Sequence, residues 1–294
     1  MTLDLHGIIP YLVTPVDQPS GRLREHELGR LVEHLLAAGV HGLSPLGSTG
    51  EFASLPAEVR LAAVRAVVHA AAGAVPVVPG VAAAGTADAV AQATAYVEAG
   101  ASGIVLIFQP YFPVSEAEAV DYYRGVAEAI DRPIVLYENP LLGPQLSLTA
   151  LEQLAELPSV RYLKDASPNT GRLLSVSNRL GGRLGLFAAS AHVPLFVLEL
   201  GGRGWMAGPA CVAPALSVEL LRRWEAGDRP AAWDLQRRLW HLNELFQRYS
   251  LAPCIKAALE ELGFQVGAPI HPQRPLRGAA LDEIRRALAT LELL

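Results

Sequence analysis

The stretch GIVLIFQPYFPVSEAEAVDYYRGVAEAIDRPIVLYENP, residues 103–140, contains the unit that repeats along this chain. Two apolar runs, which begin at Gly103 and Pro133, flank a segment whose mixed pattern predicts an amphipathic helix. Ser115 and Glu118 form a capping box at its start, because each side chain can satisfy a backbone N–H of the first turn. The two runs begin 30 residues apart, which is typical of parallel strands joined by a helix.

Similar apolar runs recur along the first three quarters of the chain. They begin at Gly7, Gly42, Pro76, Gly103, Pro133, Val160, Leu184 and Arg203, with spacings of 35, 34, 27, 30, 27, 24 and 19 residues. Eight such units, with strands apolar on both faces, predict an α/β fold, a (β/α)8 TIM barrel. A doubly wound open sheet is the alternative. No GxGxxG motif follows the first run and no GxxxxGK[ST] motif occurs, which disfavours a nucleotide-binding form of that sheet.

The last part of the chain has a helical pattern without convincing strands. We expect helices near 229–249, 253–262 and 281–293, joined by links rich in glycine and proline. The chain is therefore divided into a barrel domain at 1–225 and a C-terminal helical domain at 226–294. This extension is long enough to pack on the barrel or on a neighbouring subunit.

Composition excludes several classes of protein. The 294 residues are 51% hydrophobic and 18% charged, with a net charge of -5, so a large core is expected and nucleic acid is not an expected partner. Cys211 and Cys254 form no CxxC pair, which favours the reducing cytoplasm. The first residues lack the pattern of a secretory signal. Residues 66–87 carry no charge, but glycines and prolines interrupt them, so they do not form the unbroken apolar helix that spans a membrane, and no membrane partner is expected.

Polar residues follow the predicted strands, where a barrel carries its chemistry. They are Thr14, residues 47–51, 109–113, 137–139, 164–165, 190–192 and 206–208. Lys164 is the most informative, because the chain uses 22 arginines and only two lysines. A lysine amine that burial keeps neutral can attack a carbonyl and form a Schiff base, which arginine cannot do. Its alternative role is an ion pair with Asp165 at the barrel rim.

Two further groups can serve such a reaction. Tyr137 ends the predicted strand beside that of Lys164, and its phenol can transfer protons; it could equally be a structural aromatic with a satisfied hydroxyl. The turn Gly47-Ser48-Thr49-Gly50-Glu51 can direct backbone N–H groups at a carboxylate, while Glu51 could simply brace the loop.

Other polar residues carry weaker signals. His192 could touch substrate or act as a base, although a structural role at the rim is favoured. Arg203 should lie at the opposite end of its strand, and Lys256 is expected to be a surface or inter-helix lysine. No HxxH or HExxH motif or carboxylate cluster suits a metal, so a metal-dependent aldolase lacks its site.

Three motifs of this chain together indicate a family by their order and spacing. They are GSTGE at residues 47–51, LYENP with Tyr137, and YLKDAS with Lys164. In these motifs, and over essentially its whole length, the chain resembles the dihydrodipicolinate synthase/N-acetylneuraminate lyase family of pyruvate-dependent class I aldolases. The resemblance implies a (β/α)8 barrel with a C-terminal helical domain. It also implies a homotetramer, a dimer of dimers, that needs no metal or organic cofactor.

The resemblance also implies roles for particular residues. Lys164 would form the Schiff base with pyruvate or a longer 2-oxo acid, Tyr137 would be the general acid/base, and Ser48 would extend the proton relay. The backbone of Ser48 and Thr49 would hold the substrate carboxylate. Further candidate substrate-binding residues are Gly50, Tyr111, His192 and Met206.

Three positions depart from the family pattern. Leu142 stands where dihydrodipicolinate synthase has an arginine for its aldehyde's carboxylate, which disfavours that activity. Pro110-Tyr111-Phe112 displaces the tyrosine that reaches a neighbouring subunit, and Ser190-Ala191-His192 replaces polar or acidic residues of sugar-acid lyases. Phe112 and Leu142 motivate an alternative, a catalytically retired barrel that binds a 2-oxo acid as a sensor. Retention of Lys164, Tyr137 and Ser48 favours the aldolase or dehydratase instead.

Overall fold

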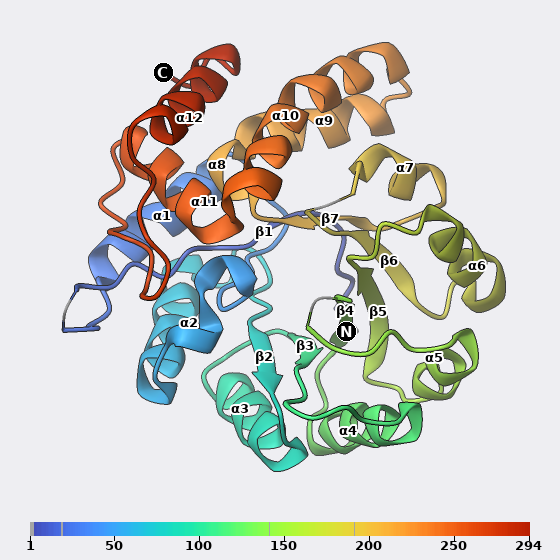
Figure 1. Cartoon of the computed structure of the whole chain (residues 1–294). Coiled ribbons are helices and arrows are strands. Elements are labelled where there is room, and N and C mark those ends of the chain that lie inside the picture. The colour runs from blue at the N-terminus through green and yellow to red at the C-terminus, as the bar shows by residue number, and fades with distance from the viewer. Residues whose placement is uncertain (1–2, 19, 141, 191) are drawn as a thin grey trace.

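The computed structural model describes residues 3–18, 20–140, 142–190 and 192–294. Seven parallel strands of this part of the chain form one curled sheet, in the order β1-β7-β6-β5-β4-β3-β2, with helices around its outside (Figure 1). The strands are β1 (Gly7–Pro10), β2 (Gly80–Ala83), β3 (Ile104–Phe108), β4 (Ile134–Glu138), β5 (Val160–Asp165), β6 (Gly185–Ala188) and β7 (Gly204–Ala207).

The predicted strand at 42–47 does not appear as a regular strand among the described residues. The chain there makes only isolated parallel bridges, Tyr11 with Ser44 and Leu43 with Val77, between the two end strands of the sheet. Backbone bonds still join both sides, from Ser44 N to the Pro10 carbonyl (3.0 Å) and from Val78 N to the Leu43 carbonyl (2.8 Å). Prolines interrupt a regular ladder because they have no N–H to donate, and they occur here at 45, 76 and 79.

Helices follow the strands in the predicted alternation. They are α1 (Glu25–Ala37), α2 (Ala57–Ala71), α3 (Thr86–Glu98), α4 (Glu116–Ala129), α5 (Leu148–Ala155), α6 (Thr170–Leu180), α7 (Pro194–Glu199), α8 (Pro209–Val212) and α9 (Pro214–Glu225). The capping box of α4 is confirmed: Ser115 Oγ accepts from Glu118 N (3.3 Å), and the glutamate accepts from Ser115 N (2.6 Å).

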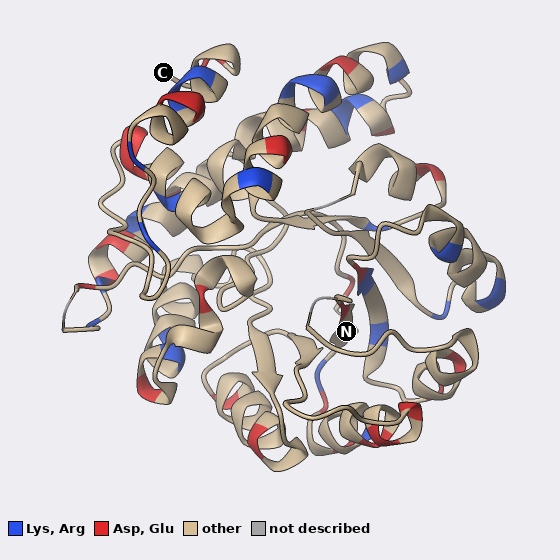
Figure 2. Cartoon of the chain, viewed as in Figure 1, with Lys and Arg blue, Asp and Glu red and all other residues tan. Residues whose placement is uncertain are grey.

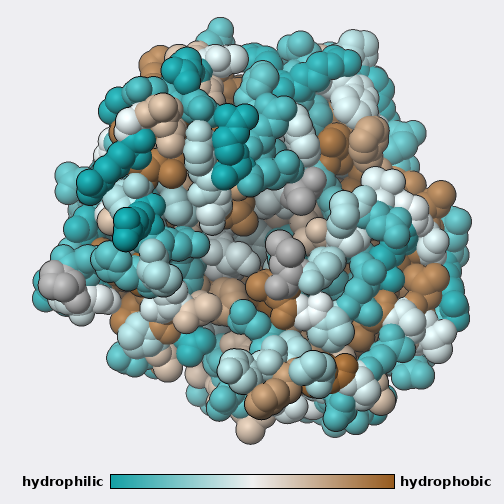
Figure 3. Space-filling view, viewed as in Figure 1, coloured by the Kyte–Doolittle hydropathy of each residue, from teal (hydrophilic) through white to brown (hydrophobic). Residues whose placement is uncertain are grey.

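Three C-terminal helices form the extension, at the bounds α10 (Arg229–Tyr249), α11 (Leu251–Glu261) and α12 (Ala279–Thr290). They lie together on one side of the barrel (Figure 1), where α11 contacts both α8 and the short helix η1 (Ser48–Gly50). Most charged residues are carried by the outer helices (Figure 2), and hydrophilic residues cover much of the same helices (Figure 3). None of the described helices is long and apolar enough to cross a bilayer.

The pairing of β4 with β5 decides which side chains enter the barrel. Tyr137 lies opposite Lys164, and Glu138 lies opposite Asp165. Because side chains alternate along a strand, the first pair shares one face and the two carboxylates share the other. Arg172 of α6 binds both carboxylates on that outer face, with Nε 3.0 Å from Asp165 Oδ2 and Nη2 bonded to Glu138 Oε2.

The remaining carboxylate oxygens are also occupied. Glu138 Oε1 accepts from Leu146 N and Asp165 Oδ1 accepts from Ser167 N, each at 2.6 Å. Burial raises the pKa of Glu138, and nearby Asp165 raises it further, whereas Arg172 opposes both effects. Arg172 therefore compensates two buried negative charges at the back of the predicted site.

We expect Arg172→Ala to lower the free energy of unfolding by about 3–5 kcal/mol at neutral pH, because it leaves buried carboxylates without a counter-charge. The pKa of Glu138 is already raised in the folded protein, so the folded state binds a proton more tightly than the unfolded state. The cost of the substitution should therefore shrink as the pH falls towards the range in which Glu138 is protonated. Urea denaturation of the wild type and the variant at several pH values measures this difference in the free energy of unfolding.

Arg179→Ala on the same helix is the matched control. Its guanidinium binds the Glu152 carboxylate at 2.7 Å, but 44% of the arginine side chain is exposed, so solvent screens the pair. Stability should hardly change. If both variants lost the same amount of unfolding free energy, the effect of Arg172→Ala would come from helix packing alone and not from the two buried carboxylates.

Candidate active site

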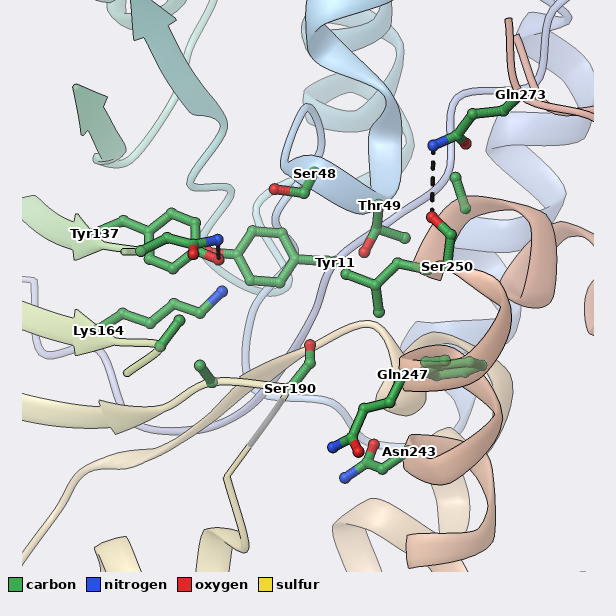
Figure 4. Close-up of a pocket in the computed structure, with 16 residues that line it drawn as sticks. Tyr11, Ser48, Thr49, Tyr137, Lys164, Ser190, Asn243, Gln247, Ser250 and Gln273 are labelled. Atoms are coloured by element: carbon green, nitrogen blue, oxygen red, sulfur yellow. Dashed lines mark hydrogen bonds between the residues drawn. The ribbon is translucent and has the colours of Figure 1, made fainter. Parts of the chain in front are cut away.

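A pocket of about 480 Å³ lies where the carboxyl ends of the strands meet the C-terminal helices (Figure 4). Lys164 is the only charged side chain among the described residues that line it. The lining residues are Tyr11, Ser48, Thr49, Tyr137, Asn139, Lys164, Ala166, Ala189, Ser190, Asn243, Phe246, Gln247, Ser250, Leu251, Ala252 and Gln273. The site thus combines the predicted Lys164, Tyr137, Ser48 and Thr49 with residues from far along the sequence.

Lys164 enters the pocket between two aromatic rings. Its Nζ lies 3.8 Å from the ring centroid of Tyr11 and 4.0 Å from that of Tyr137, and the residue is 3% exposed. The alternative ion pair with Asp165 is not formed, because that carboxylate binds Arg172; no described carboxylate lies within ion-pair distance of Nζ. Burial lowers the pKa of Lys164 well below its usual value, which favours the neutral amine.

Tyr137 presents its phenol to the same space. The hydroxyl accepts a hydrogen bond from Asn139 Nδ2 at 3.2 Å. Burial raises the pKa of Tyr137, while the hydrogen bond from Asn139 opposes that shift. The phenol is therefore protonated at neutral pH, and the amide beside it stabilises any phenolate that forms.

The loop at 47–51 approaches the rings closely. A Cβ on Gly47 would lie 2.3 Å from Tyr11 Cδ1, so only glycine fits beside that ring. Gly50 N donates to the Gly47 carbonyl (2.9 Å), and Thr14 Oγ1 donates to the Gly50 carbonyl (3.0 Å), which fixes the turn. Gly50 does not line the pocket, but it holds Ser48 and Thr49 in place.

Glu51 and Lys256 attach the extension to this loop. Lys256 Nζ lies 2.5 Å from Glu51 Oε2 and donates to the Ala268 carbonyl at 3.0 Å, while Glu51 Oε1 accepts from Ile270 N at 2.6 Å. Both residues are buried. Glu51 thus braces the loop, as one of the two predictions for it stated. Lys256 is not a surface lysine: it is buried and joins α11 to the groups of two loops.

Besides Gly50, three more predicted substrate-binding residues do not line the pocket. Met206 is fully buried in β7, and Tyr111 is 85% exposed with its ring against Phe112. His192 is buried, with Nε2 2.6 Å from the Ser167 carbonyl and Nδ1 3.4 Å from Ala189 N, so both ring nitrogens face backbone groups. The favoured structural role of His192 agrees with these contacts.

The remaining predictions concern residues near the site. Leu142 is half-buried, and its N–H donates to the Asn139 carbonyl at 2.8 Å without lining the pocket. Ser190 lines the pocket and its Oγ accepts from Gly208 N at 3.2 Å, whereas Ala191 lies outside the described residues. Arg203 pairs with Asp4, away from the pocket, as expected. Among the described residues, no group of three or more His, Cys, Asp or Glu side chains could hold a metal ion.

The sequence analysis missed Tyr11 and the polar residues of the extension, and it placed Asn139 at a strand end without giving it a role. Tyr11 has a signal in retrospect, because it follows the first predicted strand directly. Its hydroxyl is buried without a hydrogen-bond partner among the described residues. The residues of α10 and beyond had no such signal, since the barrel rule concerns only strand ends and their loops.

Comparisons with known proteins agree with this geometry. Residues 4–291 match the Dihydrodipicolinate synthetase family. An uncharacterised DapA-like lyase of Halobacterium salinarum is 35% identical over 99% of this chain and 94% of its own length. The 4-hydroxy-tetrahydrodipicolinate synthase of Acidiphilium cryptum is 31% identical over 98% of this chain and 99% of its own.

Solved structures give the same result. YagE, a prophage protein of the dihydrodipicolinic acid synthase family from E. coli K12, was crystallised with pyruvate. It is 29% identical and superposes with a TM-score of 0.91 over 98% of this chain and 99% of its own. Sequence and fold therefore agree along the whole length: the chain belongs to the dihydrodipicolinate synthetase family of lyases.

Proposed function

We propose that this chain is a class I lyase, an aldolase or dehydratase, that forms a Schiff base between Lys164 and pyruvate or a longer 2-oxo acid. The observation that carries the proposal is the buried amine of Lys164, which lies between two aromatic rings with no described carboxylate as its counter-ion. The pyruvate bound to YagE supports the choice of ligand.

The reaction begins with the neutral amine, whose lone pair attacks the 2-oxo carbon while the carbonyl π electrons move to oxygen. The resulting carbinolamine loses that oxygen as water and leaves an iminium ion on Nζ. The iminium accepts the electron pair of a neighbouring C–H or C–C bond as an enamine. Cleavage, formation or elimination at that carbon follows without a metal or organic cofactor.

Proton transfer in this scheme is assigned to Tyr137. Its phenol lies beside Nζ and is protonated at neutral pH, so it can donate a proton to the departing hydroxyl and later recover one. Asn139 donates to the phenol oxygen and stabilises the transient phenolate. Ser48, whose buried Oγ has no hydrogen-bond partner among the described residues, is assigned to the relay.

The carboxylate of the 2-oxo acid is assigned to the turn containing Ser48 and Thr49, which lines the pocket beside Tyr11. Backbone N–H groups of such a turn bind an anion without adding a second charged side chain. Met206, at the end of β7, is assigned a main-chain contact on the family resemblance. Among the described residues, the pocket lining includes no arginine for a second carboxylate, which disfavours dihydrodipicolinate synthase activity itself.

Assembly and location are further parts of the proposal. The exposed rings of Tyr111 and Phe112 pack edge to face on the surface and support contact with a neighbouring subunit in a homotetramer. The free, buried thiols of Cys211 and Cys254 support a cytoplasmic location.

Lys164→Met tests the proposal directly. Borohydride reduction with pyruvate should add a pyruvate-derived mass to Lys164 of the wild type and none to the variant, as peptide mapping will show. The variant should also melt at a higher temperature, because methionine removes the cost of burying an amine; each kcal/mol gained corresponds to about 2–4 °C in a domain of about 150–250 residues. No adduct on the folded wild type would favour the sensor instead.

The pH dependence of trapping tests the pKa of Lys164. The amine attacks only when it has lost its proton, and burial lowers its pKa. The initial rate of adduct formation should therefore rise with pH and level off well below the value of about 10.4 for an ordinary lysine. Nα-acetyllysine treated in parallel is the control. If the rates of adduct formation on Lys164 and on Nα-acetyllysine rose with the same pH midpoint, the lowered pKa of Lys164 would be contradicted.

Tyr137→Phe removes the phenol and keeps the ring beside Nζ. Loss of a general acid/base should slow adduct formation and turnover by about 10²–10⁴-fold. Tyr11→Phe should cost less, because the Tyr11 hydroxyl has no hydrogen-bond partner among the described residues. Single-turnover trapping measures both variants, and an unchanged rate in Tyr137→Phe would assign the proton transfer elsewhere.

A further inference from the structure

A second pocket lies at the opposite end of the barrel from the Lys164 amine. Its volume is about 350 Å³, and it is lined by residues at the amino ends of β5, β6 and β7 and by residues that follow α6 and α7. The amino ends of parallel strands meet at the same edge of a sheet, so segments distant in the chain come together here. Arg161 of this pocket precedes Lys164 by three residues on β5, which is about 10 Å along the strand.

Positive charge dominates the lining of this second pocket. Arg161, Arg183 and Arg203 line it, and Asp4 is the one carboxylate among its described lining residues. Three guanidinium groups against one carboxylate leave an excess of two positive charges. The chain as a whole carries a net charge of -5, so the excess is local to this end of the barrel.

The three arginines keep N–H groups that the described residues do not use. Arg161 takes part in no hydrogen bond or ion pair with them. Arg203 donates to Asp4 through Nη2, and Arg183 donates to Glu156 through Nη1 at 2.9 Å. Both carboxylates are well exposed, at 70% for Asp4 and 73% for Glu156, so solvent screens these pairs and the guanidinium groups can also bind a ligand.

The backbone of β5 is irregular at Arg161. Val160 pairs with Ile134, and Tyr162 pairs with Val135. Because the two partners on β4 are consecutive, Arg161 is the extra residue of a β-bulge, a feature that redirects a side chain and is frequent beside functional sites. Its neighbours Val160 and Tyr162 are buried, whereas Arg161 is exposed and lines the pocket. The bulge thus adds one guanidinium group to the pocket.

The stem of Arg203 is held in a fixed place. A Cβ on Gly185 would lie 2.7 Å from Arg203 Cγ and 2.8 Å from Tyr162 Cδ1, so glycine at this position leaves the room that the arginine stem occupies. The Tyr162 hydroxyl accepts a hydrogen bond from Leu5 N at 2.8 Å, which fixes the ring on the other side. The position of the guanidinium group is therefore restricted before any ligand arrives.

The chemistry of the lining indicates the class of ligand. A guanidinium group offers parallel N–H donors that match the oxygens of a carboxylate or a phosphate. An excess of two positive charges suits a dianion, and a volume of about 350 Å³ suits a small molecule. Leu184, Leu186 and Leu200 also line the pocket, and a short carbon skeleton can pack against them.

We propose that this pocket is a second ligand site, which binds a small organic dianion, a phosphate monoester or a dicarboxylate, through Arg161, Arg183 and Arg203. The site is separate from the proposed lyase reaction, because that reaction uses groups at the carboxyl ends of the strands.

Calorimetric titration of the full chain at low salt tests the site with three probes. Glycerol 3-phosphate is a phosphate monoester, succinate is a dicarboxylate, and glycerol is the uncharged control. At least one dianion should bind saturably, with an affinity that falls as salt is added, and glycerol should not bind. The tighter of the two dianions identifies which of the two groups the site prefers.

Arg161→Gln should weaken binding of that dianion by about tenfold or more, which is the effect of losing a hydrogen bond to a charged group. Arg65→Gln is the matched control, because Arg65 of α2 is also exposed, has no described ion pair and does not line the pocket. The control should bind as the wild type does. Arg183→Gln should also weaken binding, and it covers the case in which Arg161→Gln disturbs the bulge.

Lys164→Met locates the bound dianion. It changes the pocket at the carboxyl ends of the strands, so it should keep the wild-type affinity. Loss of binding in this variant would place the dianion beside Lys164 and overturn the second site. Absence of saturable binding to the wild type, or equal losses in Arg161→Gln and Arg65→Gln, would also overturn it. The borohydride experiment with pyruvate tests the Schiff base separately.

Discussion

The register between β4 and β5 is the constraint on which the site depends. It places Tyr137 and Lys164 on the inner face and Glu138 and Asp165 on the outer face. A slip of β5 by one residue would exchange Lys164 and Asp165, bring a carboxylate into the barrel and place the lysine on the same face as Glu138. Arg172 binds both outer carboxylates, so the Lys164 amine has no described carboxylate within ion-pair distance.

The C-terminal helices are part of the site rather than an accessory to it. The buried pair of Glu51 and Lys256 joins the loop at 47–51 to α11, and Glu51 also binds the backbone of the following loop at Ile270. A buried ion pair is weak evidence for stability, but its two partners must meet in one geometry. This contact therefore sets the distance between the chemical end of the pocket, at Lys164, and its outer wall on α10.

The strands and helix starts that depend on local sequence patterns could be predicted from the sequence. Apolar runs at regular spacing predicted the seven observed strands, and Ser115 and Glu118 predicted the capping box of α4. The irregular pairing of residues 42–47 could not be predicted. It depends on Pro45 and on prolines 76 and 79 of the neighbouring segment, which have no N–H to donate between segments distant in the chain. Asn243 was missed for a similar reason: an asparagine on an amphipathic helix reads as an ordinary surface residue until tertiary packing buries it.

Several polar groups in the pocket around Lys164 have no hydrogen-bond partner among the described residues. The hydroxyls of Tyr11 and Ser48 and the amide of Asn243 are buried there without one, and each lowers the stability of the folded chain. Outside the pocket, the comparable charges of Glu138, Asp165 and Arg172 satisfy one another. Groups without a described partner thus gather in this pocket, and a ligand that formed hydrogen bonds with them would stabilise the fold.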